Sequence, residues 1–205
     1  LLFPSDLTSF LDLIRQHDIP ALGNALRQAL HRQGLQQFVL ETVSALNRAI
    51  GEAWMRGEIQ VFEEHLYTEQ MQALLRQAIG ALPPGSGRPR ILLTTVPEEQ
   101  HILGILMSEA LLTLEGAGCV SLGTQTPLAD IGLAAQAQQA DIVALSFSSA
   151  FPTRQVAPLL KQLRGMLAAN IEVWAGGAGI ERVAAQEGVR IMGSMFGAVS
   201  AFASL

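Results

Sequence analysis

Hydrophobic residues recur at three- and four-residue spacing throughout the first eighty positions of the chain. This period is typical of helices that bury one side, and short polar or glycine-containing turns interrupt it. We therefore expect four helices, over residues 5–17, 20–31, 35–53 and 60–81. Four helices joined by such short turns predict an antiparallel four-helix bundle over residues 1–82.

Later residues show a different pattern, in which short apolar runs alternate with helical stretches. The runs are Arg90–Val96, Cys119–Leu122, Asp141–Phe147, Ile171–Ala175 and Val189–Met192. Near-continuous apolar strands are typical of a parallel sheet that helices cover on both faces. Residues 90–205 are therefore predicted to form an α/β domain with a doubly wound, five-stranded parallel sheet.

The two patterns meet at residues 83–89, which read Pro-Pro-Gly-Ser-Gly-Arg-Pro. Proline removes a backbone donor and glycine has little local preference, so neither a helix nor a strand is expected here. We interpret this segment as a linker between two domains.

Composition narrows the class of protein. The 205 residues are 49% hydrophobic and 15% charged, which allows a substantial core and excludes global disorder. The net charge of −5 gives neither half the basic surface typical of direct nucleic-acid binding. The sequence shows no apolar run of the roughly 18–20 residues of a membrane span and no secretion signal. A single cysteine, Cys119, suits the reducing cytoplasm. Because the first residue is Leu1 rather than Met, we expect that a segment precedes it.

Small and polar residues follow three of the predicted strands, at Pro97–Gly104, Ser146–Ser149 and Gly176–Gly179. The carboxyl ends of parallel strands share one edge of the sheet, and ligands bind there. A histidine, hydroxyl groups and glycines at this edge predict a ligand cleft. Three ordinary turns are the alternative.

The spacing of these residues resembles a known motif. Glu99-x-His101-x-x-Gly104 resembles the (Asp/Glu)-x-His-x-x-Gly motif of cobalamin-binding domains. Ser146 and Gly176–Gly177 resemble the later serine and Gly-Gly elements of the same family. The resemblance covers the whole chain after the linker and implies a flavodoxin/Rossmann-like cobalamin-binding domain.

This resemblance also implies roles for single residues. In the family, the cofactor's own dimethylbenzimidazole leaves the cobalt and the motif histidine, here His101, becomes the lower ligand. Neutral imidazole is a good metal ligand, and Glu99 can hold its other ring nitrogen. Gly104 would allow close backbone packing, Ser146 would hydrogen-bond the displaced nucleotide tail, and Gly176–Gly177 would leave room for it. A solvated surface histidine is the alternative for His101.

Two further residues belong to the expected cofactor site. The segment 122–128 also resembles this family, and Thr126 is expected to cap a helix that begins at Pro127. The family's Ser-x-Leu element reads Ser146–Phe147–Ser148 here, so Ser148 is expected to alter the lining of the tail pocket.

The helical half carries a second pattern. Trp54 is followed after nine residues by Glu64 and His65, and Val61 lies three and four residues before this pair, on the same helix face. We expect the four side chains to meet at one end of the bundle as a patch with apolar and polar groups. A core tryptophan with two exposed polar residues is the alternative.

Together, the two halves resemble the CarH/LitR class of cobalamin photoreceptors. These are transcription regulators with a MerR-type DNA-binding domain, a helical bundle carrying Trp-x9-Glu-His and a cobalamin domain. The resemblance implies that adenosylcobalamin binds between bundle and α/β domain, with Trp54, Val61, Glu64 and His65 facing the adenosyl group. It also implies that light breaks the cobalt–carbon bond and that the assembly then releases DNA.

These 205 residues contain no MerR-type domain, so the chain would be the sensor module alone. We expect a homo-oligomer that binds DNA only through a missing N-terminal domain, with no membrane contact and no enzymatic activity of its own. In this class, a histidine that ligates cobalt after illumination follows the tryptophan. Met55 occupies that place here, and a thioether binds trivalent cobalt less readily than imidazole does.

Three other functions are alternatives. A methyl-carrying corrinoid protein of a methyltransferase system, holding methylcobalamin, shares this layout, but a methyl group does not need so large a patch. A nucleotide- or flavin-binding module is disfavoured because the sequence has neither a Gly-x-Gly-x-x-Gly after the first strand nor a Gly-Lys-(Ser/Thr) loop. A radical mutase would need a separate substrate barrel, which this length cannot hold.

Overall fold

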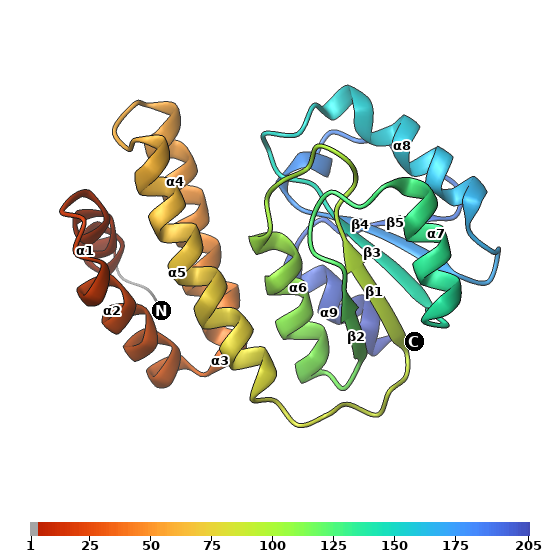
Figure 1. Cartoon of the computed structure of the whole chain (residues 1–205), viewed down its shortest axis with the longest axis horizontal. Coiled ribbons are helices and arrows are strands. Elements are labelled where there is room, and N and C mark those ends of the chain that lie inside the picture. The colour runs from red at the N-terminus through yellow and green to blue at the C-terminus, as the bar shows by residue number, and fades with distance from the viewer. Residues whose placement is uncertain (1–3) are drawn as a thin grey trace. The chain divides into compact units, whose positions relative to one another are not determined.

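A computed structural model describes residues 4–205, which form two compact units (Figure 1). The first unit extends to Ala81 and is helical, and the second begins at Leu82 and contains a five-stranded sheet. No helix among the described residues is long and apolar enough to cross a membrane.

The first unit contains the four expected helical stretches. Its elements are α1 (Pro4–Arg15), α2 (Ile19–Gln33), α3 (Leu35–Gln37), η1 (Phe38–Val43), α4 (Ser44–Met55) and α5 (Val61–Gly80). Backbone angles stay helical from α3 through η1 into α4, so these three elements form one continuous rod. Their apolar sides bury a core of large side chains, among them Leu22, Phe38, Leu46, Tyr67 and Leu75.

The middle of this rod differs from the prediction, because η1 is a π-helix rather than an α-helical turn. Four of its six residues are buried, namely Phe38, Val39, Thr42 and Val43, and the Ser44 backbone N–H bonds to the Val39 carbonyl five residues earlier, as in a π-helix. The Ser44 hydroxyl donates to the Val39 carbonyl at 3.1 Å and so binds one of the backbone acceptors of this segment.

The second unit is a doubly wound parallel sheet, which confirms the predicted fold class. Its strands are β1 (Arg90–Thr94), β2 (Gly118–Ser121), β3 (Ile142–Ser146), β4 (Glu172–Gly176) and β5 (Val189–Ile191). The strand order is β2-β1-β3-β4-β5, and all of these strands run parallel. The remaining elements are α6 (Leu103–Leu114), α7 (Leu128–Ala137), α8 (Thr153–Met166), η2 (Ala178–Ile180) and α9 (Met195–Ala203).

Helices cover both faces of the sheet (Figure 1). Residues of α7 and α8 pack on one face and residues of α6 and α9 pack on the other. β1 and β3 are neighbours, but the chain leaves β1 toward β2 and leaves β3 toward β4. The loops after these two strands therefore diverge at the carboxyl edge, which is where doubly wound sheets bind ligands.

Part of the predicted linker packs on the α/β unit. The backbone N–H and the hydroxyl of Ser86 both donate to the Gly116 carbonyl, at 3.1 Å each. Arg88 forms an ion pair with both oxygens of Asp141, at 2.8 and 2.9 Å. These contacts fix the second half of residues 83–89 to the sheet unit.

Candidate functional site

The loop between β1 and α6, residues 95–102, presents an imidazole held by a buried carboxylate. The side chain of His101 is 57% exposed, whereas the Glu99 residue is only 1% exposed. Glu99 Oε1 lies 2.8 Å from His101 Nδ1 and also accepts the His101 backbone N–H at 3.0 Å. One carboxylate therefore holds both the backbone and the imidazole ring of His101.

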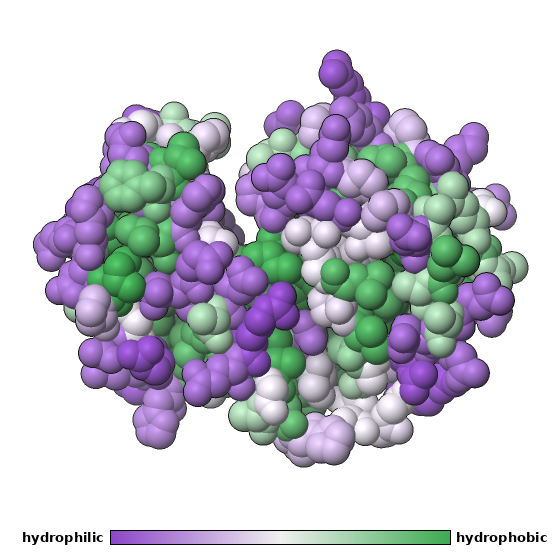
Figure 2. Space-filling view, in the orientation of Figure 1, coloured by the Kyte–Doolittle hydropathy of each residue, from purple (hydrophilic) through white to green (hydrophobic). Residues whose placement is uncertain are grey.

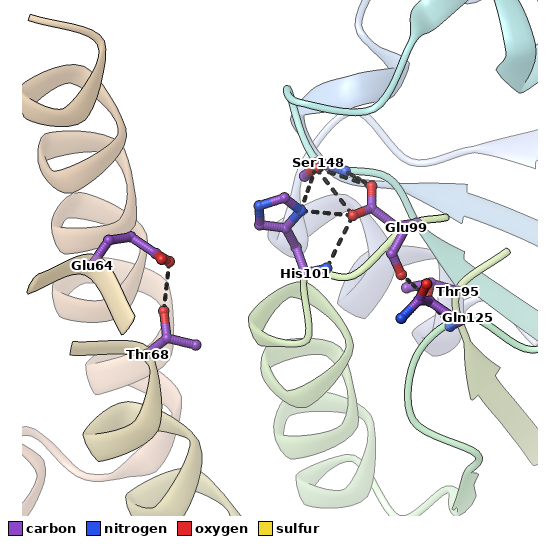
Figure 3. A network of polar contacts seen from close by, with 7 residues as sticks. All are labelled: Glu64, Thr68, Thr95, Glu99, His101, Gln125 and Ser148. Atoms are coloured by element: carbon purple, nitrogen blue, oxygen red, sulfur yellow. Dashed lines mark hydrogen bonds and ion pairs between the residues drawn. The ribbon is translucent and has the colours of Figure 1, made fainter. Parts of the chain in front are cut away.

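A third residue, Ser148, completes this cluster from the loop after β3. Its backbone N–H donates to Glu99 Oε2 at 2.8 Å, and its hydroxyl lies 3.0 Å from both Glu99 Oε2 and His101 Nδ1. Figure 3 shows the three side chains converging, with the second ring nitrogen of His101 on the side away from Glu99. The structure thus places Ser148 with the histidine, beyond the tail-pocket role expected for it.

The electrostatics of this cluster favour an ionised Glu99. Burial alone would raise the pKa of its carboxyl group, but hydrogen bonds from the His101 ring, from the backbone N–H groups of Ser148 and His101 and from the Ser148 hydroxyl outweigh this effect. The pKa of Glu99 therefore lies below its ordinary value. An ionised carboxylate fixes the proton on Nδ1 and leaves the lone pair on Nε2, which is the form of imidazole that binds a metal.

Close packing explains the glycine three residues after His101. A Cβ on Gly104 would collide with the Ser146 hydroxyl, so Gly104 lets α6 begin directly against the end of β3. Gly177 has a positive φ of 98°, and a Cβ there would collide with the carbonyl of Phe147. Gly176, by contrast, would meet Met192 at an ordinary distance of 3.6 Å. Two of the three motif glycines are therefore required by the backbone path.

The predicted cap at Thr126 is wrong. Helix α7 begins at Leu128, Pro127 is its N-cap residue, and no side-chain hydrogen bond caps it. The Thr126 hydroxyl instead lies 2.7 Å from the hydroxyl of Thr94, at the end of β1. Pro127 has an extended ψ of 141°, which places it outside the helix, and the Thr126 backbone N–H donates to the Thr95 carbonyl at 3.0 Å.

The bundle presents the other expected residues at the turn from α4 to α5. Trp54 and Val61 are 52% and 56% exposed, which excludes a core tryptophan. His65 Nδ1 lies 2.7 Å from Glu64 Oε2. Thr68 donates to Glu64 Oε1 at 2.8 Å (Figure 3). The polar pair is thus ordered and the aromatic side chain is accessible. Figure 2 shows apolar side chains among polar ones at this end of the bundle.

Three threonines in these networks were not anticipated. Thr94 and Thr95 are fully buried at the end of β1, and Thr68 holds Glu64 on α5. The sequence offered one signal, since Thr68 follows Glu64 by four residues on a predicted helix. Hydroxyls at the end of a predicted strand do not by themselves indicate which loop they bind.

Comparisons with known proteins find a B12-binding family model and two repressors similar in sequence to this chain. A family model described as "B12 binding domain" matches residues 7–79. The HTH-type transcriptional repressor CarH of Myxococcus xanthus is 30% identical over 170 residues, covering 83% of this chain and 56% of CarH. The repressor CarA of the same organism is 34% identical over 107 residues, covering 52% of this chain and 37% of CarA. The chain thus spans little more than half the length of CarH and less of CarA.

A solved structure shares the fold of the whole chain. The Methanosarcina barkeri monomethylamine corrinoid protein matches with a TM-score of 0.72 over 96% of this chain and 97% of its own length, at 17% identity. At this identity the likeness shows the fold alone, whereas the family model and the two repressors match the amino-acid sequence. The chain is thus a CarH-like cobalamin-binding module, in which a helical B12-binding domain precedes a five-stranded α/β domain.

Proposed function

We propose that the chain is the adenosylcobalamin-binding, light-sensing module of a transcription regulator, with DNA bound by a domain outside these residues. The observation that carries the proposal is the exposed His101 imidazole, held through Nδ1 by the buried Glu99. The similarity to CarH and CarA supports the regulatory role, because both are named transcriptional repressors.

The α/β site fits a metal that arrives within a cofactor. Within residues 4–205, no group of three or more His, Cys, Asp or Glu side chains could hold a metal ion. The site instead offers one imidazole. A single protein ligand suits the cobalt of a corrinoid, because the corrin ring already supplies the ligands in its own plane. His101 would bind from below through Nε2, Glu99 would keep the Nδ1 proton in place, and Ser148 would hold Glu99.

The bundle residues would contact the upper group of the cofactor. The exposed indole of Trp54 and the exposed side chain of Val61 can cover an adenine ring. Glu64 and His65 form a hydrogen-bonded pair that can bind the ribose hydroxyls or adenine nitrogens. When bound, adenosylcobalamin supplies a cobalt–carbon bond that light can break. Loss of the adenosyl group would then remove the common partner of these four residues and shift the assembly of the regulator.

The proposal is tested by an absorption spectrum of the protein loaded with adenosylcobalamin in the dark, before and after green light. We expect a spectrum of histidine-ligated, base-off cobalamin that changes on illumination, together with a change in oligomeric state on gel filtration. His101→Ala should lose the histidine-dependent spectrum and bind more weakly, while His31→Ala on α2 should behave like wild type. Wild-type affinity and an unchanged spectrum in His101→Ala would refute the ligand assignment.

A methyl-carrying corrinoid protein is the second candidate, because the same two-part fold occurs in the monomethylamine corrinoid protein. Trp54→Ala separates the two functions. If Trp54 covers an adenosyl group, the variant should lose about tenfold or more in affinity for adenosylcobalamin and less for methylcobalamin. Equal losses for both cofactors would favour the methyl carrier.

A further inference from the structure

Thr95 directly follows β1, and its buried hydroxyl joins the loop 95–102 to the loop 122–127. Its residue is fully buried, and its Oγ1 donates to the Glu99 carbonyl at 2.6 Å. The same oxygen accepts the backbone N–H of Gln125 at 2.8 Å, and the Thr95 carbonyl accepts the N–H of Thr126 at 3.0 Å. Figure 3 shows Thr95 beside Glu99 and Gln125, with His101 on the other side of Glu99.

We propose that Thr95 is a positioning residue for the cobalt ligand, which couples the loop 95–102 to the loop 122–127. The inference rests on the proposed function, in which His101 binds cobalt. Glu99 touches His101 through its carboxylate and touches Thr95 through its carbonyl, so the Thr95 hydroxyl fixes the backbone from which the carboxylate reaches the imidazole. A displacement of either loop breaks a hydrogen bond to the same oxygen atom.

Backbone conformation on both sides of this oxygen supports the role. Glu98 and Gln125 have positive φ angles of 72° and 60°, which residues other than glycine rarely adopt. Such conformations persist only where the surrounding structure determines them. Glu98 directly precedes the residue whose carbonyl Thr95 binds, and Gln125 donates its own N–H to Thr95. One hydroxyl therefore holds both strained turns.

The neighbouring threonine provides a matched control. Thr94 is equally buried, but its hydroxyl binds the Gly123 carbonyl and the Thr126 hydroxyl, both in the loop 122–127. Removing the Thr94 hydroxyl takes two contacts from that loop but leaves both hydrogen bonds of the Thr95 hydroxyl in place. A general loss of packing at the end of β1 would affect both positions alike, whereas a positioning role is specific to Thr95.

The experiment compares Thr95→Ala, Thr95→Ser, Thr94→Ala and His101→Ala, each loaded with cobinamide, a corrinoid that lacks the dimethylbenzimidazole base. Any axial nitrogen on cobalt must then come from the protein, and the paramagnetic resonance spectrum of the cobalt(II) form detects it as a nitrogen splitting. We expect Thr95→Ala to weaken this splitting and to bind about tenfold less tightly, as is typical for outer partners of a metal ligand. Thr95→Ser, which restores the hydroxyl, and Thr94→Ala should retain both properties.

The outcomes separate this inference from the proposed function. A wild-type protein without a His101-dependent splitting would overturn the ligand assignment itself. A splitting that persists at full strength in Thr95→Ala, or is lost equally in Thr94→Ala, would overturn only the role of Thr95.

If Thr95→Ala does not fold, hydrogen exchange in the wild-type protein without cofactor tests the same coupling. The amides of His101 and Gln125 should open together, with the same dependence on low concentrations of denaturant. Different dependences for the two amides would overturn the coupling.

Discussion

At the scale of single residues, Glu99 is the most constrained group in the α/β site. A buried carboxylate is unfavourable unless hydrogen bonds replace its lost hydration. Here both oxygens receive donors from two separate loops, the Ser148 backbone N–H at 2.8 Å and the His101 backbone N–H at 3.0 Å among them. An acceptor with two oxygens is therefore needed at this position.

Glu99→Gln tests that need. The amide has one acceptor oxygen, and its NH2 group must face either the Ser148 N–H or the His101 ring, so one donor loses its partner. We expect cobalamin affinity to fall about 10- to 100-fold, as for other outer partners of metal-ligating histidines. The exposed neighbour variant Glu98→Gln, measured in the same titration, should bind like wild type. Similar losses in both variants would contradict the assigned role.

A second carboxylate, Glu63, contributes to the pH dependence of the bundle's stability. Its Oε2 accepts the Gln60 backbone N–H at 2.8 Å, and its Oε1 lies 2.8 Å from His17 Nε2. The Gln60 hydrogen bond and then His17 hold the pKa of Glu63 below its ordinary value. Because the folded pKa is depressed, the resulting stability is complete above the unfolded pKa of about 4.3 and is lost as pH falls through the folded value.

Glu63→Gln keeps an acceptor for the Gln60 N–H but loses the negative charge. We therefore expect it to lower the free energy of unfolding at pH 7 by about 1 kcal/mol, the difference between a hydrogen bond to a charged acceptor and one to a neutral acceptor. This difference from wild type should shrink as the pH falls below about 4.3. Urea unfolding followed by circular dichroism between pH 3 and 7 measures it, with the exposed Glu69→Gln on the same helix as control. A difference that stays constant down to pH 3 would show that charge at Glu63 is not involved.

Sequence spacing predicted the contacts within one loop better than those between loops. Glu99 and His101 lie two residues apart, so a tight turn brings them together in almost any backbone path. Ser148 and Gln125 join the same network from 49 and 30 residues beyond Glu99 and Thr95, respectively. Those contacts depend on strand order and on loop conformation, which periodicity does not determine.

At the scale of elements, the position of α6 relative to β3 depends on Gly104. Gly104→Ala should lower the free energy of unfolding of the α/β unit by about 1–3 kcal/mol, because the added Cβ collides with the Ser146 hydroxyl. Thermal unfolding measures the effect. Gly165→Ala on α8, where a Cβ would meet nothing within 4 Å, should be neutral or stabilising. The double variant Gly104→Ala/Ser146→Ala should recover most of the loss, and a failure to recover would show that the collision is elsewhere.

The boundaries of helices and strands agree with the sequence pattern, and the helix type differs from the prediction at η1. The helix predicted over 60–81 and the strand predicted over 141–147 are α5 (Val61–Gly80) and β3 (Ile142–Ser146). The π-helical segment η1 was not predicted, because the apolar spacing of Phe38 and Thr42 is also compatible with an α-helix. The backbone hydrogen bond from the Ser44 N–H to the Val39 carbonyl, five residues earlier, distinguishes the two helix types here.

At the scale of the whole molecule, the light response that we propose would depend on which residues hold cobalamin once the adenosyl group has left. Met55 is 81% exposed at the end of α4, directly after Trp54. The CarH/LitR resemblance places a second cobalt-ligating histidine at this position, and a thioether is a weaker ligand for trivalent cobalt. We therefore expect that the illuminated wild-type protein releases cobalamin more readily than a variant with imidazole there.

Met55→His should convert this protein into one that retains cobalamin after illumination. Both proteins are loaded in the dark, exposed to green light and passed through gel filtration, and the cobalamin retained per chain is measured by absorbance. The variant should retain several-fold more and show a spectrum with two histidine ligands. Arg48→His, which adds an exposed histidine two helical turns (about 10 Å) earlier on α4, should behave like wild type because an imidazole there lies too far from position 55 to bind the same metal. If the wild-type protein already retains its cobalamin as firmly as Met55→His, another side chain supplies the second ligand. His65, hydrogen-bonded to Glu64 at the start of α5, is then the first residue to replace.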